Sequence, residues 1–142
     1  MVKMTAHYQG GLHCELRHDP SGSRIATDAP KDNMGKGERF SPTDLVGAAL
    51  ASCALTTMAI VAERDGVSLV GAQAEVEKHM ITQPTRRIGA LPLVITLPPG
   101  IPLDYRPKLE RVALQCPVHH SLHPEVEAKI RFIYPDTPGT PA

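Results

Sequence analysis

The pattern of apolar positions along the chain is dominated by one long stretch without charge, residues 45–62. It predicts a helix over Pro42–Arg64, because Ser41 can cap its start and Asp44 completes an S-x-x-D capping box. Apolar residues surround this helix instead of forming one stripe, so we expect it to be buried on all sides. Its many small and hydroxyl-bearing residues make it too weakly hydrophobic for a membrane span. We therefore predict a central core helix and no membrane association.

Elsewhere the pattern alternates with the period of a strand. Residues 11–18, for example, place Leu12, Cys14 and Leu16 on one face and polar side chains on the other. The same signal, bounded by glycine and proline turns, predicts six strands and one shorter helix. The strands are expected at residues 2–8, 11–18, 23–27, 68–80, 87–97 and 125–134, and the helix at residues 104–115.

The predicted order is βββ-α-ββ-α-β, an α+β fold with an antiparallel sheet around the long buried helix. We expect a single domain over residues 1–134 and a disordered C-terminal tail over residues 135–142, PDTPGTPA. One curved sheet covers only part of a helix that is apolar all round. The pattern therefore also predicts a homodimer, in which the second copy supplies the missing cover.

The balance of charged residues bears on which classes of partner the protein could bind. Lys plus Arg and Asp plus Glu number 15 each, which gives no indication of a nucleic-acid partner or an anionic membrane. The amino terminus, MVKMTAHYQGG, has no apolar segment typical of a secretion signal. Three cysteines are an odd number, unlike a secreted disulfide framework. We expect a cytoplasmic protein, where a cysteine pair is more often redox-active or metal-binding than structural.

Cysteine supplies the candidate chemistry. Cys53 lies in the middle of the long helix, and from that helix alone a buried structural cysteine is the simplest interpretation. Cys116 precedes Pro117, so we expect it to cap a new helical turn whose positive end favours the thiolate. Two cysteines on helices that pack together suit thiol–disulfide cycling. Cys14 is assigned to the core face of its strand.

Two further features have competing interpretations. Cys116, His119 and His120 form a C-x-x-H-H run, but no second compact ligand pair exists, so we predict no metal. Residues 28–39 form a long loop without periodicity that leads directly into the helix. Such loops are often functional, and this one brings Arg39 near the helix start, although a merely solvated loop is the alternative.

Three segments of the chain resemble a known family: RIATDAPKDNMGKGERFSPTDLVGAALASC, KHMITQPTRRIGALPLVITLP and CPVHHSLHPEVEAKIRF. Together they are similar to the osmotically inducible protein C and organic hydroperoxide resistance superfamily. The most specific pieces are SPTDL before an alanine-rich helix with A-S-C, and C-P-V about sixty residues later. The resemblance implies an α+β fold with two protomers wrapped around each other and two active sites at their interface.

The resemblance also implies roles for individual residues. Cys53 corresponds to the cysteine that attacks a hydroperoxide, and Cys116 to the one that resolves the sulfenic acid. A dithiol or lipoyl-type reductant then reduces the disulfide, with no metal or other cofactor. In relatives an arginine–glutamate ion pair lies beside the reactive thiol. Where the branch with that pair has N-P-E, this chain has S-P-T, and Arg24 and Arg39 are the two candidate arginines, with Arg39 nearer the helix.

Two functions follow as hypotheses. The first is a thiol-dependent peroxidase that reduces organic hydroperoxides or hydrogen peroxide through Cys53 and Cys116, as part of an oxidative-stress response. The alternative is a non-catalytic, stress-related binding protein that keeps a groove at the dimer interface but lacks the activating arginine and acid. The reactivity of the two thiols toward a small alkylating agent distinguishes these hypotheses.

Overall fold

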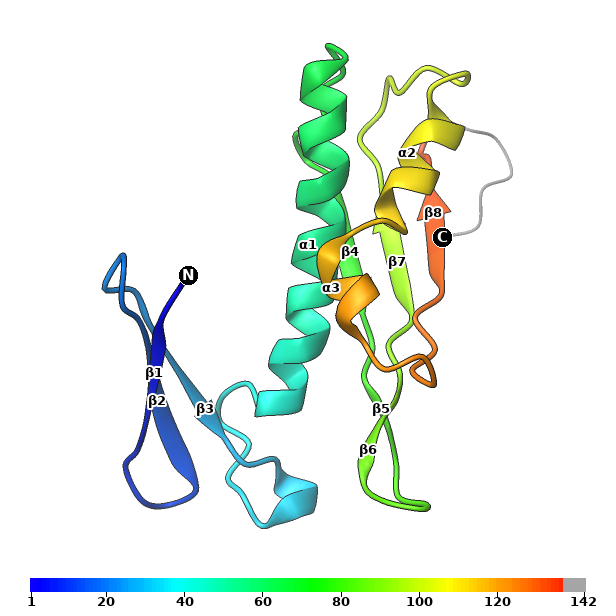
Figure 1. Cartoon of the computed structure of the whole chain (residues 1–142). Helices are drawn as coiled ribbons and strands as arrows, with labels where there is room; N and C mark the ends of the chain where they lie inside the picture. Colours follow the sequence, from blue (N-terminus) through cyan, green and yellow to red (C-terminus); the bar gives the residue numbers. More distant parts are fainter. Residues whose placement is uncertain (137–142) are drawn as a thin grey trace. The chain divides into compact units, whose positions relative to one another are not determined.

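The computed structural model describes residues 1–136 and forms two compact units, one over Met1–Val46 and one that begins at Gly47. Figure 1 gives the element labels along the chain. The α+β class predicted from the sequence is confirmed: strands and helices alternate in the predicted order, with several strands divided. The tail predicted over residues 135–142 lies outside the described residues from position 137 onward. Of its two described residues, Asp136 accepts a hydrogen bond at its carboxylate from the backbone N–H of Gly100 at 3.1 Å.

The N-terminal unit contains an antiparallel sheet of β1 (Met4–Tyr8), β2 (His13–His18) and β3 (Arg24–Asp28), followed by the 3-10 turn η1 (Lys31–Asn33). Its register places Cys14 between Tyr8 and Thr27. None of the apolar side chains in residues 1–46 is buried; Met4, for instance, is 69% exposed. Cys14 is half-buried, so its predicted place in a core is wrong for the single chain. The unit has one apolar sheet face without a core of its own.

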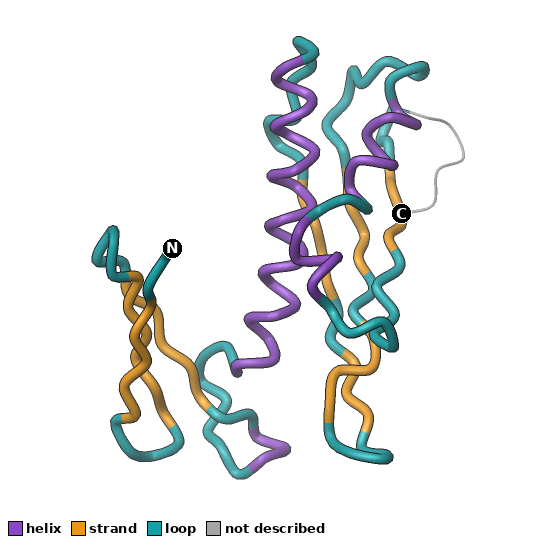
Figure 2. Tube along the Cα trace, in the orientation of Figure 1, coloured by secondary structure: helices purple, strands orange, loops and turns teal. Residues whose placement is uncertain are grey.

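Helix α1 (Pro42–Arg64) has the predicted bounds and capping box. The Ser41 hydroxyl accepts a hydrogen bond from the Asp44 backbone N–H at 3.1 Å, and the Asp44 carboxylate accepts one from the Ser41 N–H at 2.8 Å. These bonds satisfy two donors that the first turn of a helix otherwise leaves unpaired. The helix then runs without interruption to the Asp65–Gly66 turn, where Gly66 adopts a positive φ of 76° (Figure 2).

The expected burial of α1 on all sides is wrong for the single chain. One stripe is buried, comprising Gly47, Leu50, Ala51, Ala54, Met58 and Ala62. The stripe of Ala49, Ser52, Thr56 and Ile60 is exposed, with Ile60 55% accessible. Among the described residues α1 is the one helix long and apolar enough to cross a membrane, with a mean hydropathy of 2.0 over 18 residues, of which 33% are buried. Core helices meet the same criteria, and the buried stripe packs as a core helix does.

The sheet of the C-terminal unit has the order β4 (Gln73–Val76), β7 (Leu93–Thr96), β8 (Ile130–Ile133), and β5 (His79–Ile81) pairs with β6 (Arg87–Ala90) in a separate hairpin. The two long strands predicted at 68–80 and 87–97 are therefore each divided. Pro92, which has no N–H to donate, separates β6 from β7. Gly71, at a φ of 94°, lies in the loop that replaces the first residues of the predicted fourth strand.

The sheet is also mixed instead of antiparallel, because β7 and β8 run parallel. Parallel neighbours need a crossover, and α2 (Arg106–Ala113) with α3 (Pro117–Ser121) supplies it. The predicted buried face of α2, with Leu109, Val112 and Ala113, is confirmed. On β7, Leu93 and Ile95 are fully buried. Close approach of α1 to this core depends on Gly47, where a Cβ atom would lie 3.3 Å from Leu91.

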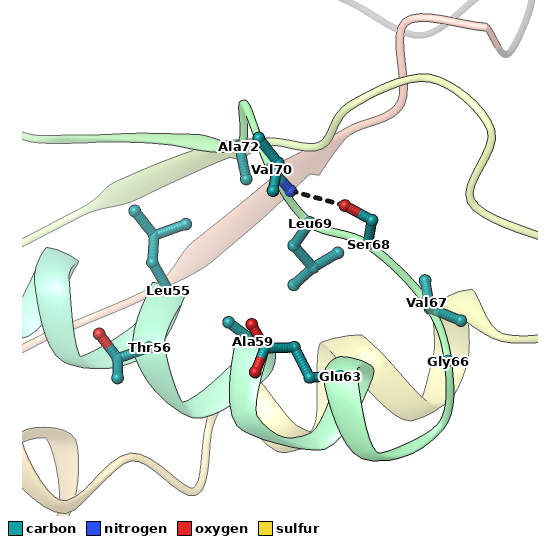
Figure 3. Close-up of a pocket in the computed structure, with 10 residues that line it drawn as sticks. All are labelled: Leu55, Thr56, Ala59, Glu63, Gly66, Val67, Ser68, Leu69, Val70 and Ala72. Carbon is teal, nitrogen blue, oxygen red and sulfur yellow. Dashed lines mark hydrogen bonds between the residues drawn. The ribbon is translucent and has the colours of Figure 1, made fainter.

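A groove of about 460 Å³ lies beside the C-terminal half of α1. Figure 3 shows Leu55 and Ala59 of the helix facing Leu69 and Val70 of the following loop across it. The loop is held by a hydrogen bond from the Val70 N–H to the Ser68 hydroxyl at 3.3 Å. Most of the lining is apolar, in keeping with the uncovered side of this helix.

Candidate functional site

Cys53 lies in the middle of α1 and is half-buried. Its position on the helix places it beside the buried stripe, between Ala49 and Thr57 on the adjacent turns. The Thr57 hydroxyl oxygen lies 3.9 Å from the Cys53 sulfur. The thiol is therefore accessible to small molecules while it contacts the protein on one side.

Cys116 caps α3, as the sequence predicted. Its side chain is fully buried, and its sulfur accepts a hydrogen bond from the backbone N–H of His119 at 3.3 Å. Burial raises the pKa of the Cys116 thiol, and the adjacent Cys53 thiol raises this pKa further. The backbone N–H groups of His119 and Val118 act in the opposite direction, because they stabilise the thiolate. The net effect keeps Cys116 protonated near neutral pH.

The Cys53 and Cys116 side chains lie close enough to interact, although one belongs to α1 and the other precedes α3. A second contact joins the end of α1 to α2: the Tyr105 hydroxyl donates to the Asp65 carboxylate at 2.7 Å, and Lys108 contacts the same carboxylate at 2.6 Å. Both lower the pKa of Asp65, whereas burial and the bond to Asp65 raise the pKa of Tyr105 to about 12.

The two candidate arginines belong to the N-terminal unit. Arg24 forms an ion pair with Glu15 on the neighbouring strand β2, and both side chains are well exposed. Arg39 is exposed in the loop before α1. Which of the two serves Cys53, and which acid accompanies it, stays a prediction.

One feature of the site was not anticipated from the sequence. In it Asp65 contacts Tyr105 and Lys108, which follow about forty residues later in the chain, so no local signal marks the contact. Thr57 follows Cys53 by one helical turn, so helical spacing alone places the two residues on the same side of α1.

Comparison with known proteins gives the family. The model of the OsmC-like protein family matches residues 35–131, more than half of the chain. None of the curated proteins matches. Among solved structures, a putative osmotic stress induced and detoxification response protein from Psychrobacter arcticus 273-4 is 39% identical, with a TM-score of 0.88 over 93% of this chain and 96% of that one.

More distant structures share the fold. OsmC from Legionella pneumophila, an organic hydroperoxide resistance protein, is 20% identical with a TM-score of 0.71, and the two chains are covered to 94% and 96%. The organic hydroperoxide resistance protein OhrB of Bacillus subtilis is 18% identical with a TM-score of 0.66, over 93% of this chain and 97% of that one. The family match covers α1, β4, β7, the first residues of β8, and both Cys53 and Cys116, and the chain therefore belongs to the OsmC-like protein family.

Proposed function

We propose that this protein is a thiol-dependent peroxidase that reduces organic hydroperoxides or hydrogen peroxide. The observation that carries the proposal is the pairing of a half-buried cysteine on α1 with a buried cysteine at the cap of α3. Membership of the OsmC-like family supports it, as do the names of two relatives, which refer to organic hydroperoxide resistance.

The half-buried thiol is the one that meets the peroxide. The Cys53 thiolate attacks the terminal oxygen of the hydroperoxide, so that an S–O bond forms as the O–O bond breaks. The alkoxide leaves and takes up a proton as an alcohol, or as water when the substrate is hydrogen peroxide. The sulfur loses two electrons and becomes a sulfenic acid. Arg39 or Arg24 would favour the thiolate and polarise the peroxide.

The buried thiol then resolves the sulfenic acid. Before oxidation, the charge of a Cys53 thiolate opposes ionisation of Cys116, which raises the Cys116 pKa. A sulfenic acid is neutral, so this opposition disappears and the N–H of His119 stabilises the Cys116 thiolate. Cys116 attacks the Cys53 sulfur, an S–S bond forms, and hydroxide leaves to combine with the proton released by Cys116. A dithiol, for example a lipoyl group, reduces the disulfide and completes the cycle.

The proposal includes a homodimer. The N-terminal unit has an apolar sheet face without a core, and α1 has an uncovered stripe that includes Ala49 and Ile60. Exposure of this apolar surface to water is unfavourable. A second copy of the chain can bury it and is available wherever the protein is made. No nucleic-acid or membrane partner is part of the proposal.

Mass spectrometry of peroxide-treated protein tests the function. We expect a disulfide between Cys53 and Cys116 with Cys14 free, and loss of peroxide consumption in Cys53→Ser, because a hydroxyl has almost no anion at neutral pH. In Cys116→Ser we expect oxygen added to Cys53, because the sulfenic acid has no resolving partner. Cys14→Ser is the matched control. Reduced thiols after prolonged exposure would refute the peroxidase and favour the binding protein, and a disulfide to Cys14 would refute the assignment of residues.

A further inference from the structure

Two adjacent threonines of α1 use their hydroxyl groups differently. Thr56 donates to the backbone carbonyl of Ser52 at 2.9 Å, which is the usual arrangement for a threonine inside a helix. The contact of the Thr57 hydroxyl is with the Cys53 sulfur at 3.9 Å instead of with a carbonyl one turn back. The side chain of Thr57 is therefore directed at the reactive thiol.

The Thr57 hydroxyl can supply a hydrogen-bond donor that the backbone of α1 cannot offer to the Cys53 sulfur. The backbone N–H groups around Cys53 are engaged in the hydrogen bonds of α1, since the residue lies in the helix interior. Cys116, in contrast, caps its helix and receives the N–H of His119. A Cys53 thiolate can therefore draw on side-chain donors, and among the described residues of the C-terminal unit the Thr57 hydroxyl and the adjacent Cys116 thiol are within reach.

We propose that Thr57 is a positioning residue whose hydroxyl donates a hydrogen bond to the Cys53 thiolate and holds it ready for attack. In the thiol form either atom can be the donor, but a thiolate only accepts, so the hydroxyl must donate in the reactive state. A hydrogen bond to the charged form of a thiol stabilises that form, so loss of the donor should slow reactions that need the thiolate. This inference deepens the proposed peroxidase function and rests on it for its biological meaning.

The test compares matched variants of the full-length protein. Thr57→Val removes the hydroxyl and keeps the shape of the side chain, and Thr57→Ser keeps the hydroxyl. The control is Thr82→Val, the same substitution at an exposed position after β5, outside α1. The measurement is the rate of iodoacetamide labelling of Cys53 from pH 5 to pH 10, followed on the Cys53 peptide by mass spectrometry. We expect Thr57→Val to slow labelling at pH 7 about fivefold, the factor that corresponds to one ordinary hydrogen bond.

We also expect the midpoint of the labelling profile to move to higher pH in Thr57→Val and to return in Thr57→Ser. Thr82→Val should keep the wild-type profile. An unchanged profile in Thr57→Val would overturn the inference, as would an equal change in Thr82→Val, because that would indicate an effect not specific to the thiol. The labelling reaction needs no peroxide, so it tests the role of Thr57 independently of peroxidase activity. A wild-type protein that consumes no peroxide would refute the proposed peroxidase and leave the labelling test valid.

Discussion

Oxidation by one equivalent of hydroperoxide should stabilise the fold by closing a large loop. A disulfide between Cys53 and Cys116 joins about 64 residues, most of the C-terminal unit, into one ring. In the chain-entropy model, a ring of about this size lowers the free energy of folding by about 4 kcal/mol, since it restricts the unfolded chain. This is an upper limit, because any strain in the folded disulfide subtracts from it.

Urea unfolding of oxidised and reduced protein measures the effect. At an m value of about 2 kcal/mol per molar urea, the midpoint should rise by about 2 M on oxidation. Both samples need the same protein concentration, because the proposed dimer would make the midpoint depend on it. A non-reducing gel should show no covalent dimer, since Cys53 and Cys116 belong to the same compact unit of one chain.

The matched control is Cys116→Ser, which keeps a side chain of similar size but cannot form the bond. Its midpoint should not rise after treatment with peroxide. A midpoint that stays the same or falls in the oxidised wild type would refute the reasoning, as would a covalent dimer on the gel. A covalent dimer would mean that the two sulfurs do not meet within one folded chain. An unchanged midpoint would mean that the disulfide does not restrict the unfolded chain by more than it strains the folded one.

Two further predictions concern the surroundings of the thiol. Arg39→Ala should leave the far-UV circular dichroism unchanged and lower peroxide consumption at pH 7 about tenfold, since one pKa unit of thiolate stabilisation corresponds to that factor. Lower peroxide consumption in Arg24→Ala alone would assign the role to Arg24. Unchanged consumption in both variants would contradict an activating arginine. Ala49→Asp should prevent dimer formation in sedimentation velocity, because burying an unpaired charge costs several kcal/mol. The control Ala49→Ser should still form the dimer. A well-folded wild-type monomer at micromolar concentration would contradict the dimer itself.

The sequence by itself determined the elements whose signals are local. The capping box at Ser41 and Asp44, the bounds of α1 and the buried face of α2 all follow from residues within a few positions of one another. The cap at Cys116 followed in the same way from the proline after it. Each of these features depends on backbone hydrogen bonds or helical spacing, which act over one or two turns.

Only the tertiary structure decided what depends on distant parts of the chain. Strand direction is one case: β8 pairs in parallel with β7 because a helical crossover returns the chain to the same end of the sheet, and a pattern of alternating residues is the same for both directions. The meeting of Cys53 and Cys116 is the other. It brings together residues far apart in the chain, as the contact between Asp65 and Tyr105 also does, and such contacts arise from side-chain packing that exists only once the chain has folded.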